Sequence, residues 1–457
     1  MSEGKAGPAL GRWWCELAWL GGEDATADVL LEAGADGSFS RVEPGVQRDA
    51  AGDAVPLFGL TLPGLVSAHS HAFHRALRAW TQRDGGSFWT WRQRMYDLAG
   101  RLDPDRYWQL ASAAFAELAL AGVTTVGEFL YLHRDRDGRP YAGDPFGDAV
   151  VEAAASAGVR LTLLDACYLA GGVNHPLDEV QRRFGDGDAE AWAARVGGRA
   201  DGPLLRVGGA IHSVRAVPPA QAEVVAAWAG GRGAPLHAHV SEQPAENEDC
   251  LAAYGRTPTG VLADIGALGP GFTAVHATHL TADDVALLGG SGSAVCLCPT
   301  TERDLADGIG PAAALRRAGS PLSLGSDSHA VVDLFEEARA VELDERLASG
   351  ARGTHAPADL LAAATAGGAQ ALGWPGGGRL AVGAPADLCV VDLRRPQLAG
   401  TVSAGGANAA AAAVFAADAS TVIDVVVAGR PVVAGGRHVL GDVGALLAGA
   451  VAAVWEG

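Results

Sequence analysis

The segment Gly64-Leu65-Val66-Ser67-Ala68, followed at once by His69-Ser70-His71, decides the fold of this 457-residue chain. It is a short apolar run of the kind that forms a buried strand, and it ends in two histidines. Residues two apart in a strand point to the same face, roughly 6–7 Å apart along the chain. Both imidazoles can therefore reach one metal ion at a Zn–N distance of about 2.0–2.1 Å. Two polar residues at a strand end would also explain the pair, so the pattern leaves metal binding open.

Seven more apolar runs follow, and helical stretches lie between them. The runs cover residues 123–126, 160–164, 205–207, 236–240, 273–275, 294–297 and 322–324, and the clearest helical stretches are 107–121, 147–157 and 219–229. Strand–helix alternation repeated eight times predicts a parallel (β/α)8 TIM-type barrel. We expect the barrel to span residues 65–377, as the catalytic domain.

Both ends of the chain have a different, β-rich character. Short strands are expected at 13–20, 28–32 and 39–42, and again at 388–391, 422–427 and 431–433, while the alanine-rich stretch 404–417 is interpreted as a loop plus a helix. Strands that flank a barrel in this way can pair with each other. We therefore expect a small β-sandwich domain built from residues 1–64 and 378–457.

The charged residues exclude several classes of function. The formal net charge is −19, the opposite sign to that of a sequence-independent nucleic-acid binder. An anionic substrate would need specific arginines to overcome this field locally. Lys5 is the only lysine, which excludes a lysine Schiff base, a P-loop lysine and a carboxylated lysine bridging two metals from the body of the chain.

The apolar residues predict a cytoplasmic protein. No segment reaches the roughly 18 uninterrupted apolar residues of a membrane span, and the opening residues lack the apolar region of a signal peptide. The six cysteines are scattered, without a CxxC pair, and are expected to be free thiols.

Three other strand ends carry groups suited to catalysis. His237, His239 and Glu242 follow one apolar run, His276 and His279 the next, and Asp327 and His329 the last. Barrel enzymes place their catalytic groups at the carboxyl ends of the strands. The joint occurrence of these residues, in this order, favours metal binding and catalysis at one site.

These segments resemble the amidohydrolase superfamily. PGLVSAHSHAFHRA (63–76), HAHVSEQ (237–243), VHATH (275–279) and GSDSH (325–329) look like its strand 1, 5, 6 and 8 signatures, and GAPADL (383–388) is similar to the return segment of its small β-domain. Within the superfamily, SFWTWR (87–92), GEFLY (127–131), HSVR (212–215), CPTTE (298–302) and HSHAFHR (69–75) resemble the N-formimino-L-glutamate deiminases.

The resemblance implies a mononuclear metal centre. Its ligands would be His69, His71, His239 and Asp327, binding one zinc ion per subunit, with iron or manganese as alternatives. Asp327 would also accept a proton from the attacking water. Glu242 would shuttle protons, and His276 would orient the water and stabilise the oxyanion.

The resemblance also implies a carboxylate clamp for the substrate. Arg92 and Arg215 would bind carboxylates, and Tyr131 and His212 would donate or accept hydrogen bonds. The chain departs from the common pattern at His74, where many members carry glutamine, and at Leu130, where they carry histidine. Both departures are expected near the substrate, and His74 can still donate a hydrogen bond to it.

Other polar residues in these segments receive a structural interpretation. We expect His237 to be a neighbour of the site rather than a ligand, and His279 and His329 to be structural. Glu246 and Glu248 are interpreted as solvated carboxylates at the start of a helix.

The activity implied is deimination of N-formimino-L-glutamate to N-formyl-L-glutamate and ammonia in histidine breakdown, by a protein expected to be a homodimer. One alternative is another deaminase or chlorohydrolase of the same scaffold, acting on guanine, cytosine or an S-adenosylhomocysteine-like purine. A protein that kept the barrel but lost its metal and catalysis is the alternative of a different class. The complete set of ligand and acid–base residues argues against it.

Overall fold

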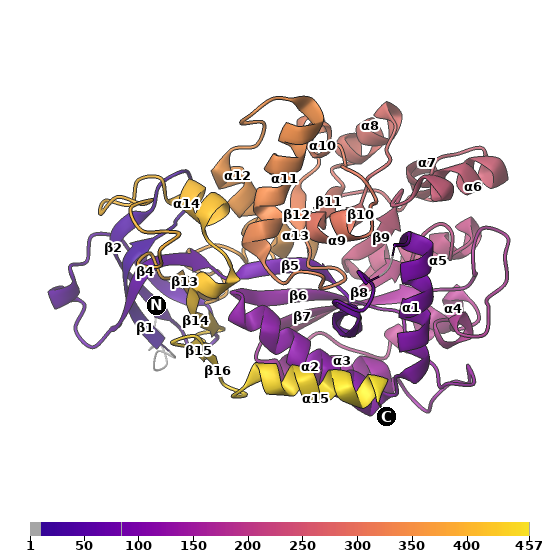
Figure 1. Cartoon of the computed structure of the whole chain (residues 1–457), viewed down its shortest axis with the longest axis horizontal. Coiled ribbons are helices and arrows are strands. Elements are labelled where there is room, and N and C mark those ends of the chain that lie inside the picture. Colours follow the sequence, from indigo (N-terminus) through magenta and orange to yellow (C-terminus); the bar gives the residue numbers. More distant parts are fainter. Residues whose placement is uncertain (1–10, 84, 457) are drawn as a thin grey trace, which may run out of the picture.

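The computed structural model describes residues 11–83 and 85–456 and has two parts, a β-domain and a barrel (Figure 1). Lys5 lies outside the described residues. In Figure 1 the β-domain occupies the left of the molecule, and the barrel with its helices occupies the right.

The barrel consists of eight parallel strands that are neighbours in chain order. They are β5 (Leu65–Ser70), β6 (Val123–Leu130), β7 (Arg160–Cys167), β8 (Leu205–Ile211), β9 (Leu236–Val240), β10 (Phe272–His276), β11 (Ala294–Leu297) and β12 (Leu322–Leu324). All eight expected strands are therefore confirmed. Two backbone hydrogen bonds of 3.0 Å join the segment after β12 to β5, from His71 N to Asp327 O and from Asp327 N to His69 O. This seam places the histidine pair beside Asp327.

Helices surround the barrel, and the three helical stretches expected from the sequence are confirmed as α2 (Pro104–Leu120), α3 (Pro145–Ala157) and α5 (Pro219–Arg232). Asp103 and Asp144 each accept a backbone hydrogen bond at a helix start, and each is followed by a proline. This pair favours a helix start because the aspartate accepts a hydrogen bond from one free backbone N–H of the first turn, and the proline has no backbone N–H that needs a partner. The other helices are α1 (Phe88–Arg101), α4 (Ala189–Val196), α6 (Pro244–Tyr254), α7 (Pro258–Asp264), α8 (Ala282–Ser291), α9 (Pro299–Asp304), α10 (Ala312–Ala318), α11 (Leu334–Ser349), α12 (Pro357–Ala362) and α13 (Gly368–Ala371).

The β-domain combines strands from both ends of the chain, as expected. Hydrogen bonds join its strands into a single mixed sheet in the order β16-β15-β14-β13-β4-β1-β2-β3. Their bounds are β1 (Gly11–Ala18), β2 (Thr26–Ala33), β3 (Phe39–Glu43), β4 (Val55–Pro63), β13 (Leu388–Val391), β14 (Val422–Val427), β15 (Arg430–Ala434) and β16 (Arg437–His438), and α14 (Ala409–Ala416) lies in the alanine-rich stretch.

Strand β4 links the two parts and was not expected from the sequence. It pairs in parallel with β1 and antiparallel with β13, and one residue later the chain enters β5 of the barrel. Its sequence VPLFGLTLP contains two prolines and a glycine, Gly59 with φ of +109°, so it has the composition of a turn. Its position in the centre of the sheet nevertheless ties the first barrel strand to the β-domain.

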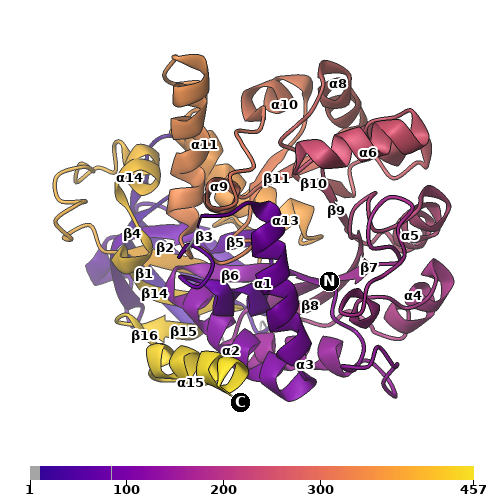
Figure 2. The same cartoon turned by 45° about the vertical axis from the view of Figure 1, so that its right-hand side comes forward.

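The last helix, α15 (Val443–Trp455), was not expected either. It lies along the barrel helix α2, as Figures 1 and 2 both show, and not on the β-sheet. The indole Nε1 of Trp455 donates to the carbonyl of Ala76 at 3.0 Å, and the ring stacks on Trp80. The end of the described chain is thus anchored to the barrel, close to the segment that follows β5.

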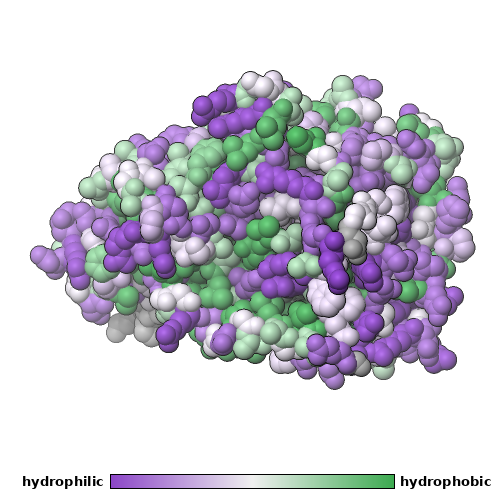
Figure 3. Space-filling view, viewed as in Figure 1, coloured by the Kyte–Doolittle hydropathy of each residue, from purple (hydrophilic) through white to green (hydrophobic). Residues whose placement is uncertain are grey.

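Side-chain burial agrees with these two parts. The barrel strands β5, β6, β7, β9, β10 and β11 are buried along their whole length, as expected for parallel strands covered by helices. All six cysteines are buried free thiols, as expected. Hydrophilic and hydrophobic residues are interspersed on the face in Figure 3, and no helix in residues 11–83 and 85–456 is long and apolar enough to cross a membrane.

Candidate active site

Four side chains converge at the carboxyl ends of β5, β9 and β12. The Nε2 atom of His239 lies 3.1 Å from that of His69 and 3.4 Å from that of His71. Asp327 Oδ1 lies 3.5 Å from the Nε2 atoms of His69 and His71. All four side chains are buried. The structure therefore brings together the four residues that the resemblance implied as metal ligands.

The chemistry of this cluster fits a bound cation. The Nδ1 of His71 lies 2.9 Å from the carbonyl of Phe129, and the Nδ1 of His239 lies 2.8 Å from the carbonyl of His212. A carbonyl only accepts, so each Nδ1 carries the proton and each neutral Nε2 carries a lone pair. The two Nε2 atoms lie 3.4 Å apart, and because neither carries a proton they cannot hydrogen-bond to each other. A divalent cation between them would satisfy both, together with His69 and Asp327.

The acid–base groups lie beside this cluster. His276 Nε2 is 3.6 Å from Asp327 Oδ2 and 3.7 Å from Glu242 Oε1, and its Nδ1 is 3.3 Å from Glu302 Oε1. His276 and Asp327 have left-handed backbones, with φ of +67° and +38°. Such conformations cost free energy for residues other than glycine and occur at functional sites. His276 is the last residue of β10, Asp327 lies three residues after β12, and their side chains face each other.

Burial and neighbouring charges shift the pKa values of these groups. Burial raises the pKa of Glu242, although His276 and Arg215 partly offset the effect. Burial alone would lower the pKa of His276, but Glu242, Glu302 and Asp327 together hold it well above its ordinary value. Burial would raise the pKa of Asp327, yet its interactions with His69 and His276 bring it down to about 2. The site thus contains an ionised carboxylate and a carboxyl group that takes up a proton more readily than usual, as acid–base chemistry requires.

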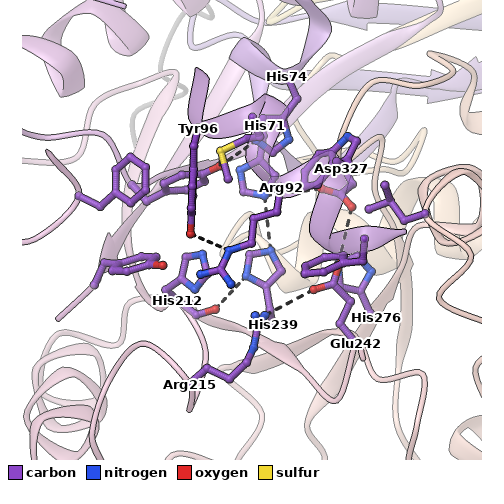
Figure 4. A pocket seen from close by; sticks show the side chains of 17 residues that line it. His71, His74, Arg92, Tyr96, His212, Arg215, His239, Glu242, His276 and Asp327 are labelled. Carbon is purple, nitrogen blue, oxygen red and sulfur yellow. Dashed lines mark hydrogen bonds and ion pairs between the residues drawn. The ribbon is translucent and has the colours of Figure 1, made fainter. Parts of the chain in front are cut away.

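A pocket opens onto this centre, and all of the expected substrate residues line it (Figure 4). They are His74, Arg92, Tyr131, His212 and Arg215, which lie with His71, His239, Glu242, His276 and Asp327 around one cavity. They come from the segment after β5, from α1, and from the ends of β6 and β8. Residues from distant parts of the sequence thus meet at one end of the barrel.

The two arginines have different surroundings. Arg92 Nε donates to Tyr96 Oη at 2.6 Å, and its guanidinium lies 5.5 Å and 5.2 Å from the ring centres of Trp89 and Tyr96. Among the described residues, no carboxylate forms an ion pair with Arg92. Arg215, in contrast, lies 3.6 Å from Glu242 and 3.7 Å from Glu246. The charge of Arg92 is therefore left for a ligand, while Arg215 already faces two carboxylates.

The two departures from the family pattern lie in different places. His74 lines the pocket, and its Nε2 is 2.8 Å from Tyr131 Oη, while its buried Nδ1 has no hydrogen-bond partner among the described residues. Leu130 is fully buried in the hydrophobic core and is not among the residues that line the pocket. Only His74 is therefore placed to contact a substrate.

The remaining histidines are held by the fold. His237 Nε2 donates to Ala371 O at 2.9 Å, His279 Nε2 donates to Asp307 O at 2.7 Å, and His329 Nε2 lies 2.9 Å from Ser70 Oγ. These contacts agree with the structural roles expected for them. The interpretation of Glu246 as solvated was wrong, because it is 1% exposed beside Arg215, whereas Glu248 is exposed.

Part of the pocket wall was not expected from the sequence. Phe88, Trp91, Met95 and Tyr96 line the pocket with Arg92 from one face of α1, which crosses in front of the barrel strands in Figure 2. Their spacing is that of one helix face, so a search for helical periodicity around Arg92 could have found them. Tyr168, Phe184 and Leu305 complete the apolar wall, and no local pattern marks them.

Comparisons with known proteins agree with this geometry. A family model described as the amidohydrolase family matches residues 60–432. The chain is 41% identical over 428 residues to formimidoylglutamate deiminase of Pseudomonas aeruginosa, covering 90% of this chain and 92% of that protein. It is 31% identical over 345 residues to 8-oxoguanine deaminase of the same organism, covering 75% and 76%.

Solved structures show the same fold. An amidohydrolase from Brucella melitensis matches with a TM-score of 0.87 and 32% identity, covering 97% of this chain and 99% of that one. An adenosine deaminase from Xanthomonas campestris with bound zinc matches with a TM-score of 0.81 and 25% identity, covering 96% of each chain. A family model that spans most of the sequence, together with relatives matched over nearly all of it, shows that the chain belongs to the amidohydrolase family.

Proposed function

We propose that the protein hydrolyses the C=N bond of N-formimino-L-glutamate, giving N-formyl-L-glutamate and ammonia. The observation that carries the proposal is the guanidinium of Arg92, which lines the pocket of a metal-hydrolase centre without a carboxylate partner among the described residues. An unpaired guanidinium in such a place selects an anionic substrate. The Pseudomonas aeruginosa relative, 41% identical, is named for this activity.

We propose one zinc ion per subunit, held by His69, His71, His239 and Asp327. Three imidazoles and a carboxylate suit zinc, and iron or manganese can occupy the same donors according to availability. The Xanthomonas relative carries zinc. The zinc ion would supply Lewis acidity, which makes water a nucleophile near pH 7.

The protein's own groups would then move the protons. Asp327 accepts a proton from the attacking water, and Glu242 delivers a proton to the leaving nitrogen, because an amide anion is too basic to leave. One water adds to the formimino carbon, and its two protons reach the terminal nitrogen, one by way of Asp327 and one by way of Glu242. The C–N bond to that nitrogen then breaks, ammonia departs, and the oxygen stays as the formyl carbonyl. His276, whose Nε2 lies between Asp327 and Glu242, stabilises the oxyanion that forms on that carbon.

The pocket would hold both carboxylates of the substrate. Arg92 pairs with one of them, Arg215 supports the other, and His212 and His74 donate hydrogen bonds, while Tyr131 donates to Nε2 of His74 and so leaves the His74 proton on Nδ1. The unpartnered Nδ1 of His74 supports its part in this contact, in the place where other members carry glutamine. We further propose that the protein acts in histidine breakdown in the cytoplasm. The homodimer implied by the resemblance stays a prediction.

A panel of substrates tests the proposal. Ammonia release by the zinc-loaded protein is measured with N-formimino-L-glutamate, N-formimino-L-aspartate, 8-oxoguanine and 5-methylthioadenosine. We expect kcat/KM above about 10⁴ M⁻¹s⁻¹ for formiminoglutamate only. Turnover of a purine alone would refute the substrate and support the rival deaminase function that the second relative suggests.

A further inference from the structure

Glu302 is a buried carboxylate beside the active site, and it has no role in the proposed proton transfers. Its Oε1 lies 3.3 Å from Nδ1 of His276, and the same oxygen accepts the backbone N–H of Cys298 at 2.8 Å. It is 5% exposed, and His276 is its only ion-pair partner among the described residues. A carboxylate in this environment has a strong preference for an N–H donor.

The helix that carries Glu302 is held on both sides. Thr300 donates to Glu337 of α11 through its backbone N–H and its hydroxyl, at 3.0 Å and 2.5 Å. Thr301 Oγ1 lies 3.0 Å from Ser328 Oγ and accepts the backbone N–H of Ser328 at 3.2 Å. The segment CPTTE thus fixes α9 against α11 and against the segment that follows β12. Glu302 therefore presents its carboxylate from a rigid element, as a positioning group must.

The two edges of the His276 ring face different partners. Nδ1 faces Glu302, and Nε2 faces Glu242 at 3.7 Å and Asp327 at 3.6 Å. A carboxylate on Nδ1 keeps a proton on that nitrogen, so it determines which nitrogen is turned to the substrate.

We propose that Glu302 is a positioning residue that holds the His276 imidazole in the orientation its catalytic role requires, with Nδ1 on Glu302 and Nε2 toward Glu242 and Asp327. Glu302 does not touch the substrate pocket, since it is absent from the lining residues. Its contribution passes through His276 alone. Removing Glu302 should therefore lower kcat and leave KM and metal content almost unchanged.

The kinetic test rests on the proposed function and uses a double-mutant cycle. General acid–base groups contribute about 10²- to 10⁴-fold, so we expect Glu302→Ala to lower kcat about 10- to 100-fold. Glu302→Gln keeps an oxygen acceptor and should lose less. In a His276→Asn background, Glu302→Ala should lower kcat less than about threefold further, because its partner is already gone. An unchanged kcat in Glu302→Ala, or an equal loss in both backgrounds, overturns the proposal.

A matched control and a spectroscopic measurement separate positioning from stability. Glu342→Gln is the control, because Glu342 on α11 is also a buried carboxylate but lies away from the pocket. Its partners are Arg346 and two backbone N–H groups. This substitution should lower Tm without lowering kcat.

A low-field imidazole N–H proton signal should be present in the wild type and absent in both His276→Asn and Glu302→Ala. This signal needs no substrate, so it decides the pairing even if formiminoglutamate is not turned over. A signal that persists in Glu302→Ala refutes the pairing.

Discussion

Replacing Arg92 by alanine should raise KM for formiminoglutamate and leave the metal centre intact. Arg92 is half-buried, stacks near Trp89 and Tyr96, and has no carboxylate partner among the described residues. In the free enzyme the tyrosine hydroxyl is the main group it binds. A substrate carboxylate could therefore bind this guanidinium without first displacing another carboxylate.

The size of the effect follows from losing one partner of a partly buried charge pair. Such a truncation costs about 2–4 kcal/mol when the other charge stays behind. At about 1.4 kcal/mol per factor of ten, kcat/KM should fall roughly 30- to 700-fold. Arg92→Lys keeps the charge but loses the planar fork, so we expect a smaller loss of about tenfold.

Steady-state ammonia release from the zinc-loaded variants is the assay. Arg94→Ala is the matched control, because Arg94 lies on the same helix, is 63% exposed in its side chain and does not line the pocket. It should behave like the wild type. A formimino compound that lacks the carboxylate bound by Arg92 should be a poor substrate for the wild type and should lose nothing further in Arg92→Ala. An unchanged KM for formiminoglutamate in Arg92→Ala would refute the clamp.

Three other changes have defined outcomes. Glu242→Gln should lower kcat at least 100-fold while metal analysis still finds one ion per chain; loss of the ion would contradict its role as a proton shuttle. His239→Asn should lose the metal, whereas His237→Asn, two residues away, should retain it, as measured by elemental analysis. Burial raises the pKa of Glu128 from 4.5 to about 7. The folded protein therefore binds the proton of Glu128 more tightly than the unfolded chain does. As a result, the free energy of unfolding should fall by up to about 3 kcal/mol as pH rises from about 4.5 to 7. Glu128→Gln should flatten this slope in urea unfolding, and an unchanged slope would refute the assignment.

The barrel could be predicted because its strands are buried on both faces. Such strands are continuous apolar runs, and their order in the sequence is their order in the barrel. The residues proposed as metal ligands, His69, His71, His239 and Asp327, were implied by the resemblance of these segments to the amidohydrolase superfamily, and each lies within a barrel strand or up to three residues after one. Strand β4 was missed because its prolines and glycine have the composition of a turn, and only its neighbours β1 and β13 make it a strand.

The rest of the site depends on contacts between distant segments. Glu246 seemed solvated because the start of its helix is polar, yet Arg215 from the end of β8 lies against it. The contact between Glu302 and His276 could not be predicted, because it depends on how α9 packs beside the end of β10. Leu130, expected near the substrate, points into the core instead. Local sequence indicates which residue types follow each strand, but the position of the loops decides which of them meet.

The central claim is that the metal centre adds one water to the formimino carbon of N-formimino-L-glutamate. The most direct measurement is an NMR time course of that substrate with the zinc-loaded protein, together with an ammonia assay on the same sample. We expect N-formyl-L-glutamate and ammonia in equal amounts, with no reaction when the metal is removed by a chelator and recovery when zinc is restored. Release of free glutamate instead, or equal turnover by the metal-free protein, would contradict it.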